Sequence, residues 1–185
     1  MTAQDADILP DLLTSNLDVV FCGTAAGRTS ALKRAYYAHR RNRFWPILHE
    51  CGLTDRQLPA NEFAHLHQYG IGLTDLCKVA SGNDDELPSG ALTPARLLEA
   101  IAVYKPRYLA FTSRTAGRVV CGNSAQYGRQ HSRDETQVFI LPTTSSRRGD
   151  KWWDTQKRYW HEFADAVRAS RRSQKSIASI AVVEE

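Results

Sequence analysis

The sequence is poor in cysteine: four residues in 185, far apart and with no C-x-x-C pair. That spacing predicts neither a disulfide framework nor a zinc or iron–sulfur site. The chain also has no run of about eighteen apolar residues, and residues 1–10 contain neither a basic segment nor a long apolar stretch. We therefore expect reduced, mostly buried thiols, no metal, no membrane association and a cytoplasmic location, close to the nucleoid in a bacterium.

The composition is that of a chain that folds around a core. It contains 42% hydrophobic and 24% charged residues, and its length of 185 residues fits one domain. We expect a monomer with a single domain over residues 1–185 and with flexible ends at about 1–16 and 173–185. Residues 170–175 (SRRSQK) predict either a non-specific DNA contact or simple fraying.

The net charge of +4 is modest, but the basic residues are unevenly distributed. Six of them fall within residues 28–43, a stretch that also contains Tyr36 and Tyr37 and runs into Phe44 and Trp45. Basic side chains interleaved with aromatic rings suit phosphates and bases together. A solvated surface rich in arginine is the alternative interpretation.

Strand-like and helix-like segments alternate along the chain. Short apolar runs predict strands at residues 18–22, 71–73, 107–112 and 137–141. Apolar residues at helical spacing predict helices at residues 42–51, 61–69, 93–105 and from about 150, and the composition of 80–90 predicts a loop. The order predicts an α/β fold with three α/β/α layers and a central, mostly parallel four-stranded sheet.

In such a sheet the ligand crevice lies beyond the carboxyl ends of the strands. This rule selects residues 23–27, 74–75, 113–114 and 142–148 as one rim. The first of these resembles a phosphate-binding loop, but only three residues separate Gly23 from Gly27, and Arg28 stands where that motif has lysine. The hypothesis of a nucleotide-hydrolysing enzyme rests on this loop alone. A turn that lets a flat ligand approach the backbone closely fits these residues better.

Four segments in order, VVFCGTAAG, YYAHRRNRFWPIL, CGLTDRQL and YGIGLTDL, resemble the uracil-DNA glycosylase superfamily. The resemblance is to the mismatch-specific uracil- and thymine-DNA glycosylases over about residues 18–165, with some features of the hypoxanthine-DNA glycosylase branch. It implies a monofunctional DNA repair enzyme that flips uracil, or another deaminated base, out of DNA and hydrolyses the N-glycosidic bond. It also implies DNA containing such a base as the partner, and no cofactor.

The resemblance leaves the catalytic residue open. In the family, a G-I-N-P-G loop provides an asparagine that positions the attacking water, and the aligned residue here is Ala25. Asp75, at a predicted strand end, could orient or deprotonate water and stabilise charge on the sugar, or else be a cap or surface carboxylate. Asn42 matches an asparagine of the hypoxanthine-acting relatives, with helix capping as its alternative.

The resemblance also implies a set of base contacts. Tyr37 aligns with the aromatic residue that stacks on the flipped base, although a core tyrosine is an equal alternative. The expected base-binding residues are Gly23, Thr24, Ala25, Tyr37, Phe44 and Ser113. For the neighbouring His39 we expect a structural hydrogen bond rather than acid catalysis or metal binding.

Residues 142–149 (PTTSSRRG) align in part with the family motif N-P-S-G-L-S-R, whose loop fills the space of the flipped nucleotide. Thr143 replaces the asparagine and Arg147 replaces the leucine, so a guanidinium would fill the space of the flipped nucleotide. The alternative interpretation of these residues is a mobile basic loop. The expected DNA-binding residues are Arg114, Ser145, Ser146, Arg147, Arg148 and Lys151. A second hypothesis, prompted by Ala25, is a non-catalytic lesion- or DNA-binding protein on the same fold.

Overall fold

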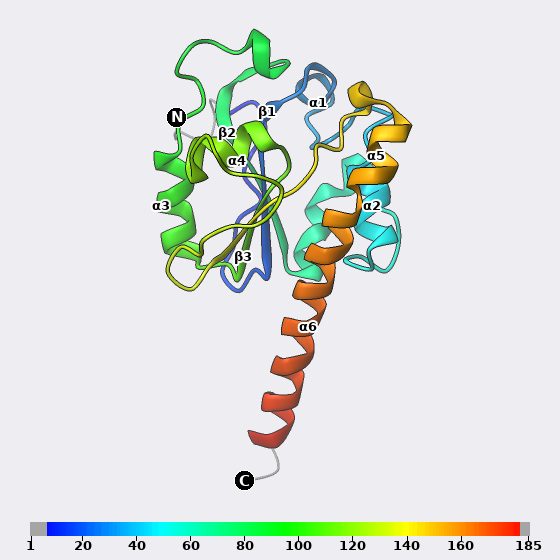
Figure 1. Ribbon diagram of the computed structural model, residues 1–185, viewed down its shortest axis with the longest axis vertical. Coiled ribbons are helices and arrows are strands. Elements are labelled where there is room, and N and C mark those ends of the chain that lie inside the picture. The colour runs from blue at the N-terminus through cyan, green and yellow to red at the C-terminus, as the bar shows by residue number, and fades with distance from the viewer. Residues whose placement is uncertain (1–6, 182–185) are drawn as a thin grey trace.

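Figure 1 shows the computed structural model of the protein, which describes residues 7–181, with side chains to residue 174. The chain forms a five-stranded sheet with helices on both faces, which confirms the predicted three-layer α/β/α fold. The strand order is β2-β1-β3-β5-β4, and all neighbours are parallel except β4 and β5. The strands are β1 (Val19–Ala26), β2 (Ile71–Ser81), β3 (Tyr108–Phe111), β4 (Gly128–Arg129) and β5 (Gln137–Ile140). The short β4 is the strand that the sequence pattern did not predict.

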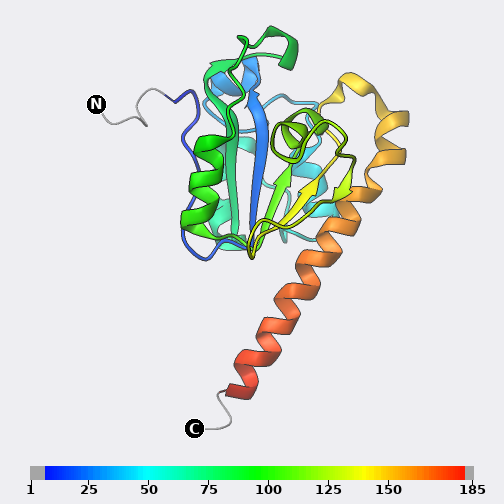
Figure 2. The same cartoon turned by 60° about the vertical axis from the view of Figure 1, so that its left-hand side comes forward.

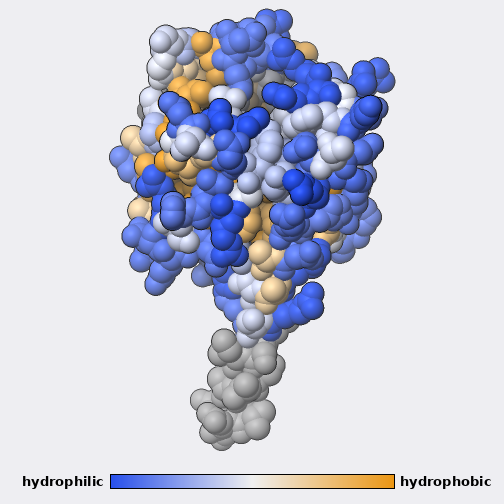
Figure 3. All heavy atoms as spheres, viewed as in Figure 1, coloured by the Kyte–Doolittle hydropathy of each residue, from blue (hydrophilic) through white to orange (hydrophobic). Residues whose placement is uncertain are grey.

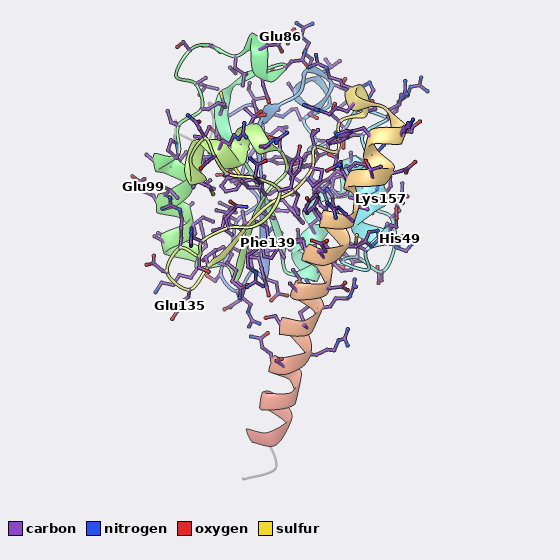
Figure 4. All side chains as sticks on the ribbon, viewed as in Figure 1. His49, Glu86, Glu99, Glu135, Phe139 and Lys157 are labelled. Carbon is purple, nitrogen blue, oxygen red and sulfur yellow. The ribbon has the colours of Figure 1, made fainter. Side chains whose placement is uncertain are left out.

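Helices of two types connect the strands or follow the last of them. The α-helices are α1 (Arg28–Lys33), α2 (Phe44–Glu50), α3 (Ala95–Tyr104), α4 (Arg114–Cys121), α5 (Asp150–Gln156) and α6 (Arg158–Ala181). The 3₁₀ helices are η2 (Ala60–Tyr69), η3 (Asp84–Glu86) and η4 (Ser146–Arg148). The predicted final helix is thus two helices, which meet at Lys157, a residue labelled in Figure 4.

The sheet separates two apolar clusters, because alternate side chains of a strand point to opposite faces. In β1, Val19 and Phe21 pack with α2, α5 and α6, whereas Val20 and Cys22 pack with α3 and α4. Both sets are fully buried, which explains why β1 is a continuous apolar run rather than an alternating one. Phe139, labelled in Figure 4, belongs to the first cluster.

Residues 8–12 lie along the open edge of β2. The Ile8 N–H donates to the Lys78 carbonyl (2.8 Å), and Leu12 exchanges backbone hydrogen bonds with Leu73. Leu9 and Leu12 are buried, so this part of the stretch expected to be flexible is packed against the sheet. At the other end α6 continues to Ala181 and projects from the body of the molecule (Figures 1 and 2). Residues 1–6 and 182–185, also expected to be flexible, lie outside the described residues.

The first two strands are longer than predicted. Residues 23–26 are not a turn but the end of β1, and β2 runs on to Ser81. The two strands support each other through the pairs Gly23 with Asp75 and Ala25 with Cys77, beyond which the register shifts. The loop therefore begins at Gly82, whose N–H donates to the Ala26 carbonyl (3.0 Å).

Candidate active site

A cleft of about 1140 Å³ lies at the carboxyl ends of the parallel strands. Segments remote in sequence line it together, as the strand-end rule predicts: residues 23–27, Asp75, residues 113–114 and residues 143–148. Of the predicted site residues, all but Phe44 and Lys151 are among its lining residues. Lys151 is instead an exposed residue of α5.

Asp75 lies on β2, directly beside Gly23 of β1, with 4% of its surface exposed. A Cβ atom at Gly23 would collide with Oδ1 of Asp75, so only glycine leaves room for this carboxyl group. Burial raises the pKa of Asp75 from its usual 3.8 to about 7, although the charges of Lys78 and Arg96 lower it. The carboxyl group can therefore exchange a proton near neutral pH.

A network of charged groups lies beside Asp75 at the edge of the sheet. Lys78 donates to Oδ1 of Asp11 (2.7 Å), which also accepts from the Thr74 hydroxyl (2.7 Å). Arg96 forms an ion pair with Asp11 and donates to the backbone carbonyl of Asp75 (2.9 Å). The network connects residue 11 to the strand that carries Asp75, and nothing in the local sequence around Asp11 indicates it.

Tyr37 lines the cleft, and its ring is held from two sides. It stacks on Phe44 with ring centroids 3.8 Å apart and an interplanar angle of 17°, and its hydroxyl forms a 3.0 Å hydrogen bond with that of Thr112. Burial raises the pKa of Tyr37 well above its usual value, so its hydroxyl stays protonated at neutral pH. Phe44 itself is fully buried, which corrects the expected base contact: Phe44 supports Tyr37 from behind.

Several expected contact residues already have partners. Asn42 lines the cleft, but its Oδ1 accepts the Phe44 N–H (3.0 Å) and so stabilises the start of α2. Ser113 accepts the Ala116 N–H (3.1 Å) and caps α4. The Thr24 hydroxyl donates to Asp84 (2.6 Å). For each of these side chains, binding of a ligand would compete with a contact inside the protein.

The basic loop 142–149 is anchored at its base by Arg43. The Arg43 N–H donates to the Thr144 carbonyl (3.0 Å), its guanidinium donates to the Ser145 carbonyl (3.3 Å), and it forms an ion pair with Asp150. Arg43 belonged to the predicted basic stretch, but its anchoring role depends on contacts about a hundred residues away in sequence. Arg147 and Arg148 remain exposed on η4.

The opposite wall of the cleft is the loop after β2, which sequence composition marked only as a surface excursion. Asn83, Asp84 and Asp85 line the cleft there, and Glu86 pairs with Arg28 (2.7 Å). Figure 4 shows Glu86 at the end of the molecule away from the projecting helix α6. One wall is therefore acidic, whereas the wall formed by loop 143–148, which follows β5, is basic.

The chemistry of the cleft does not match a nucleotide triphosphatase. Residues 23–26 are extended strand, and α1 has only six residues, so no loop wraps a phosphate group as in that motif. Among the side chains that the structure describes, residues 7–174, no group of three or more His, Cys, Asp or Glu could hold a metal ion. His39 accepts the Arg41 N–H (3.2 Å), which is the type of structural hydrogen bond expected for it.

None of the helices in the described part of the chain has the length and apolar character needed to cross a membrane.

Comparison with known proteins identifies a family and a solved structure that are similar to this chain. The family model described as the uracil DNA glycosylase superfamily matches residues 10–166. A solution NMR structure of a protein from Methanosarcina acetivorans, provisionally named a uracil DNA glycosylase, superimposes with a TM-score of 0.60 and 21% sequence identity. The match covers 86% of this chain and 96% of the other, which shows that the two proteins share a fold.

Proposed function

This chain belongs to the uracil DNA glycosylase superfamily, and on that premise we propose that it is a DNA repair glycosylase acting on uracil or another deaminated base. The observation that carries the proposal is the cleft that unites Asp75, Tyr37 and the basic loop 143–148. The finer resemblance to the mismatch-specific and thymine-DNA glycosylases stays a prediction. DNA containing the damaged base is the proposed partner, and the proposed site needs no cofactor.

The cleft is large enough for a flipped nucleotide together with part of its backbone, because ligand sites for small molecules measure about 300–1,000 Å³. The extruded base would stack on the Tyr37 ring, on the face that Phe44 does not cover. Arg147 and Arg148 would neutralise neighbouring phosphates and fill the space that the base leaves. These contacts would hold the extruded nucleotide in the cleft.

Asp75 is the proposed catalytic residue. As the bond from C1′ to the base breaks, its electron pair leaves with the base and positive charge develops on the sugar. An ionised carboxylate stabilises that charge, orients a water molecule toward C1′ and accepts the proton that the water loses. Asn42 is the alternative, but its carbonyl oxygen already accepts the Phe44 N–H.

The test is the incubation of purified protein with uracil-containing oligonucleotides, single-stranded and opposite each base, followed by alkaline cleavage at abasic sites. We expect cleavage that accelerates as pH rises through about 7, and we expect Asp75→Asn to be slower by about 10²-fold or more and to lose this pH dependence. Gly23→Ala should lose activity because the new Cβ displaces Asp75. Gly27→Ala is the matched control, because a Cβ there meets nothing within 4 Å.

If Asn42→Ala abolishes base release and Asp75→Asn does not, the catalytic role passes to Asn42. If no substrate in the panel yields alkali-labile sites, glycosylase activity on uracil is wrong. The second candidate, a non-catalytic lesion- or DNA-binding protein, is favoured by Ala25 at the position of the family asparagine. It predicts salt-sensitive DNA binding without base release.

A further inference from the structure

Two tyrosine rings continue the cleft beyond its basic wall, toward the β4 edge of the sheet. Tyr127 lines the cleft just before β4, and Tyr159 lies near the start of α6. Their ring centroids are 5.5 Å apart, with an interplanar angle of 47°. Both residues are only partly buried, so this ring pair has a solvent-accessible surface next to the proposed site.

An arginine lies over each ring. The Arg114 guanidinium is 4.8 Å from the centroid of Tyr127, and that of Arg158 is 4.7 Å from the centroid of Tyr159. Neither guanidinium forms a salt bridge with a carboxylate among the described residues. Arg114 donates to the neutral Gln126 side chain (3.1 Å), and Arg158 donates to the hydroxyl of Tyr159 (3.1 Å). Two positive charges are thus held beside aromatic rings without being neutralised by the surrounding protein.

Rings and uncompensated guanidinium groups in one patch match the chemistry of single-stranded nucleic acid. Unpaired bases of any sequence stack on aromatic rings and on the guanidinium planes that lie over them, while arginine also neutralises the phosphates between the bases. A DNA duplex offers no free base faces to such rings. The patch also begins where the cleft ends, because Arg114 and Tyr127 belong to both.

The distribution of charge around the cleft favours one path for a bound DNA strand. The acidic residues Asp84 and Asp85 follow β2 at one edge of the sheet, and the tyrosine pair lies at β4, the opposite edge. Phosphates are repelled by the first wall and attracted by the second. A strand with one nucleotide in the cleft would therefore extend over the tyrosines.

We propose that Tyr127 and Tyr159, with Arg114 and Arg158, form a stacking platform for unpaired bases adjacent to the flipped nucleotide, so that the protein takes single-stranded DNA. This inference rests on the proposed function for the position of the flipped nucleotide. The platform itself is a binding surface and can be measured without base release.

The test uses fluorescence anisotropy with unmodified oligothymidylate, which contains no base to release. We expect Tyr159→Leu to weaken binding about tenfold, the loss typical of one base–ring stack, whereas Tyr159→Phe, which keeps the ring, binds as the wild type does. Arg158→Ala should weaken binding more than Arg172→Ala, a matched loss of charge at an exposed position farther along α6. Thermal melts verify that each variant is folded.

A duplex of the same length is the discriminating substrate, and we expect Tyr159→Leu to leave its affinity unchanged. The platform would be wrong if Tyr159→Leu lost as much affinity for the duplex as for the single strand. It would also be wrong if Arg158→Ala and Arg172→Ala lost equal affinity for oligothymidylate, or if Tyr159→Leu bound oligothymidylate as the wild type does. If the protein releases no uracil but still binds oligothymidylate in a way that depends on the Tyr159 ring, the proposed function is wrong and the platform is supported.

Discussion

At the scale of single residues, the unusual feature is a carboxyl group, Asp75, in a buried position of a sheet edge strand. Burial disfavours its charged form, and the partly compensating charges of Lys78 and Arg96 lie beside it. Groups with strongly raised pKa values in clefts are candidates for proton transfer, because protein stability alone does not favour them. Asp75 should therefore reduce stability at neutral pH while supporting chemistry.

The substitution Asp75→Asn tests whether the buried carboxyl group lowers the stability of the protein. Because the pKa of Asp75 is 3.8 unfolded and about 7 folded, folding favours the protonated form, and wild-type stability falls as pH rises from about 4 through about 7. Asparagine cannot ionise, so the variant should gain up to about 4 kcal/mol relative to the wild type above pH 7. Thermal melts from pH 4 to pH 8 measure the difference; an offset that is constant with pH would contradict the raised pKa. Asp154→Asn, at an exposed carboxylate of α5, is the control.

The sequence located residues of the cleft better than it assigned their contacts. Asp75 and Tyr37 were found because strand ends meet at one rim and because the motifs resemble a known family. Phe44, Ser113 and Thr24 were harder to assign, since a side chain's partner depends on segments distant in sequence: Ser113 caps α4, and Thr24 is engaged by Asp84 across the cleft. Thr112, which binds the Tyr37 hydroxyl, could have been found from its place at the end of β3.

At the scale of elements, the edge strand β2 depends on the segment before β1. Residues 8–12 add backbone hydrogen bonds to β2 and place Asp11 between Lys78 and Arg96. The lengths of β1 and β2 were underestimated because the two strands extend each other through pairing, which no short apolar run reveals. Alternation of strands and helices still predicted the layers, since that pattern depends on burial alone.

Asp11→Ala should therefore destabilise the protein by about 3–5 kcal/mol, because it leaves Lys78, with 4% of its side chain exposed, without its carboxylate. Urea unfolding measures the change in the free energy of unfolding. Adding Lys78→Met to Asp11→Ala removes the unpaired charge and should recover part of the loss. A loss below about 1 kcal/mol for Asp11→Ala alone would show that water reaches the lysine.

At the scale of the whole molecule, the distribution of charge between the two walls of the cleft matters more than the net charge. The face in Figure 3 is largely hydrophilic, and the net charge is only +4. The acidic loop after β2 and the basic residues near loop 143–148 face one cleft from different sides. On the proposed function, such an arrangement would attract a strand on one side of the cleft without strong DNA binding over the rest of the surface.

Asp85→Asn should then increase affinity for oligonucleotides about two- to fivefold at low salt, because an exposed negative charge on the cleft wall no longer repels phosphates. The gain should shrink as salt rises and screens the charge. Glu135→Gln changes the net charge by the same amount, but Figure 4 places Glu135 at the opposite end of the body from Glu86, so its effect should be small. Binding titrations at several salt concentrations measure both variants. If the two gain equally, total charge governs binding and the acidic wall has no directing role.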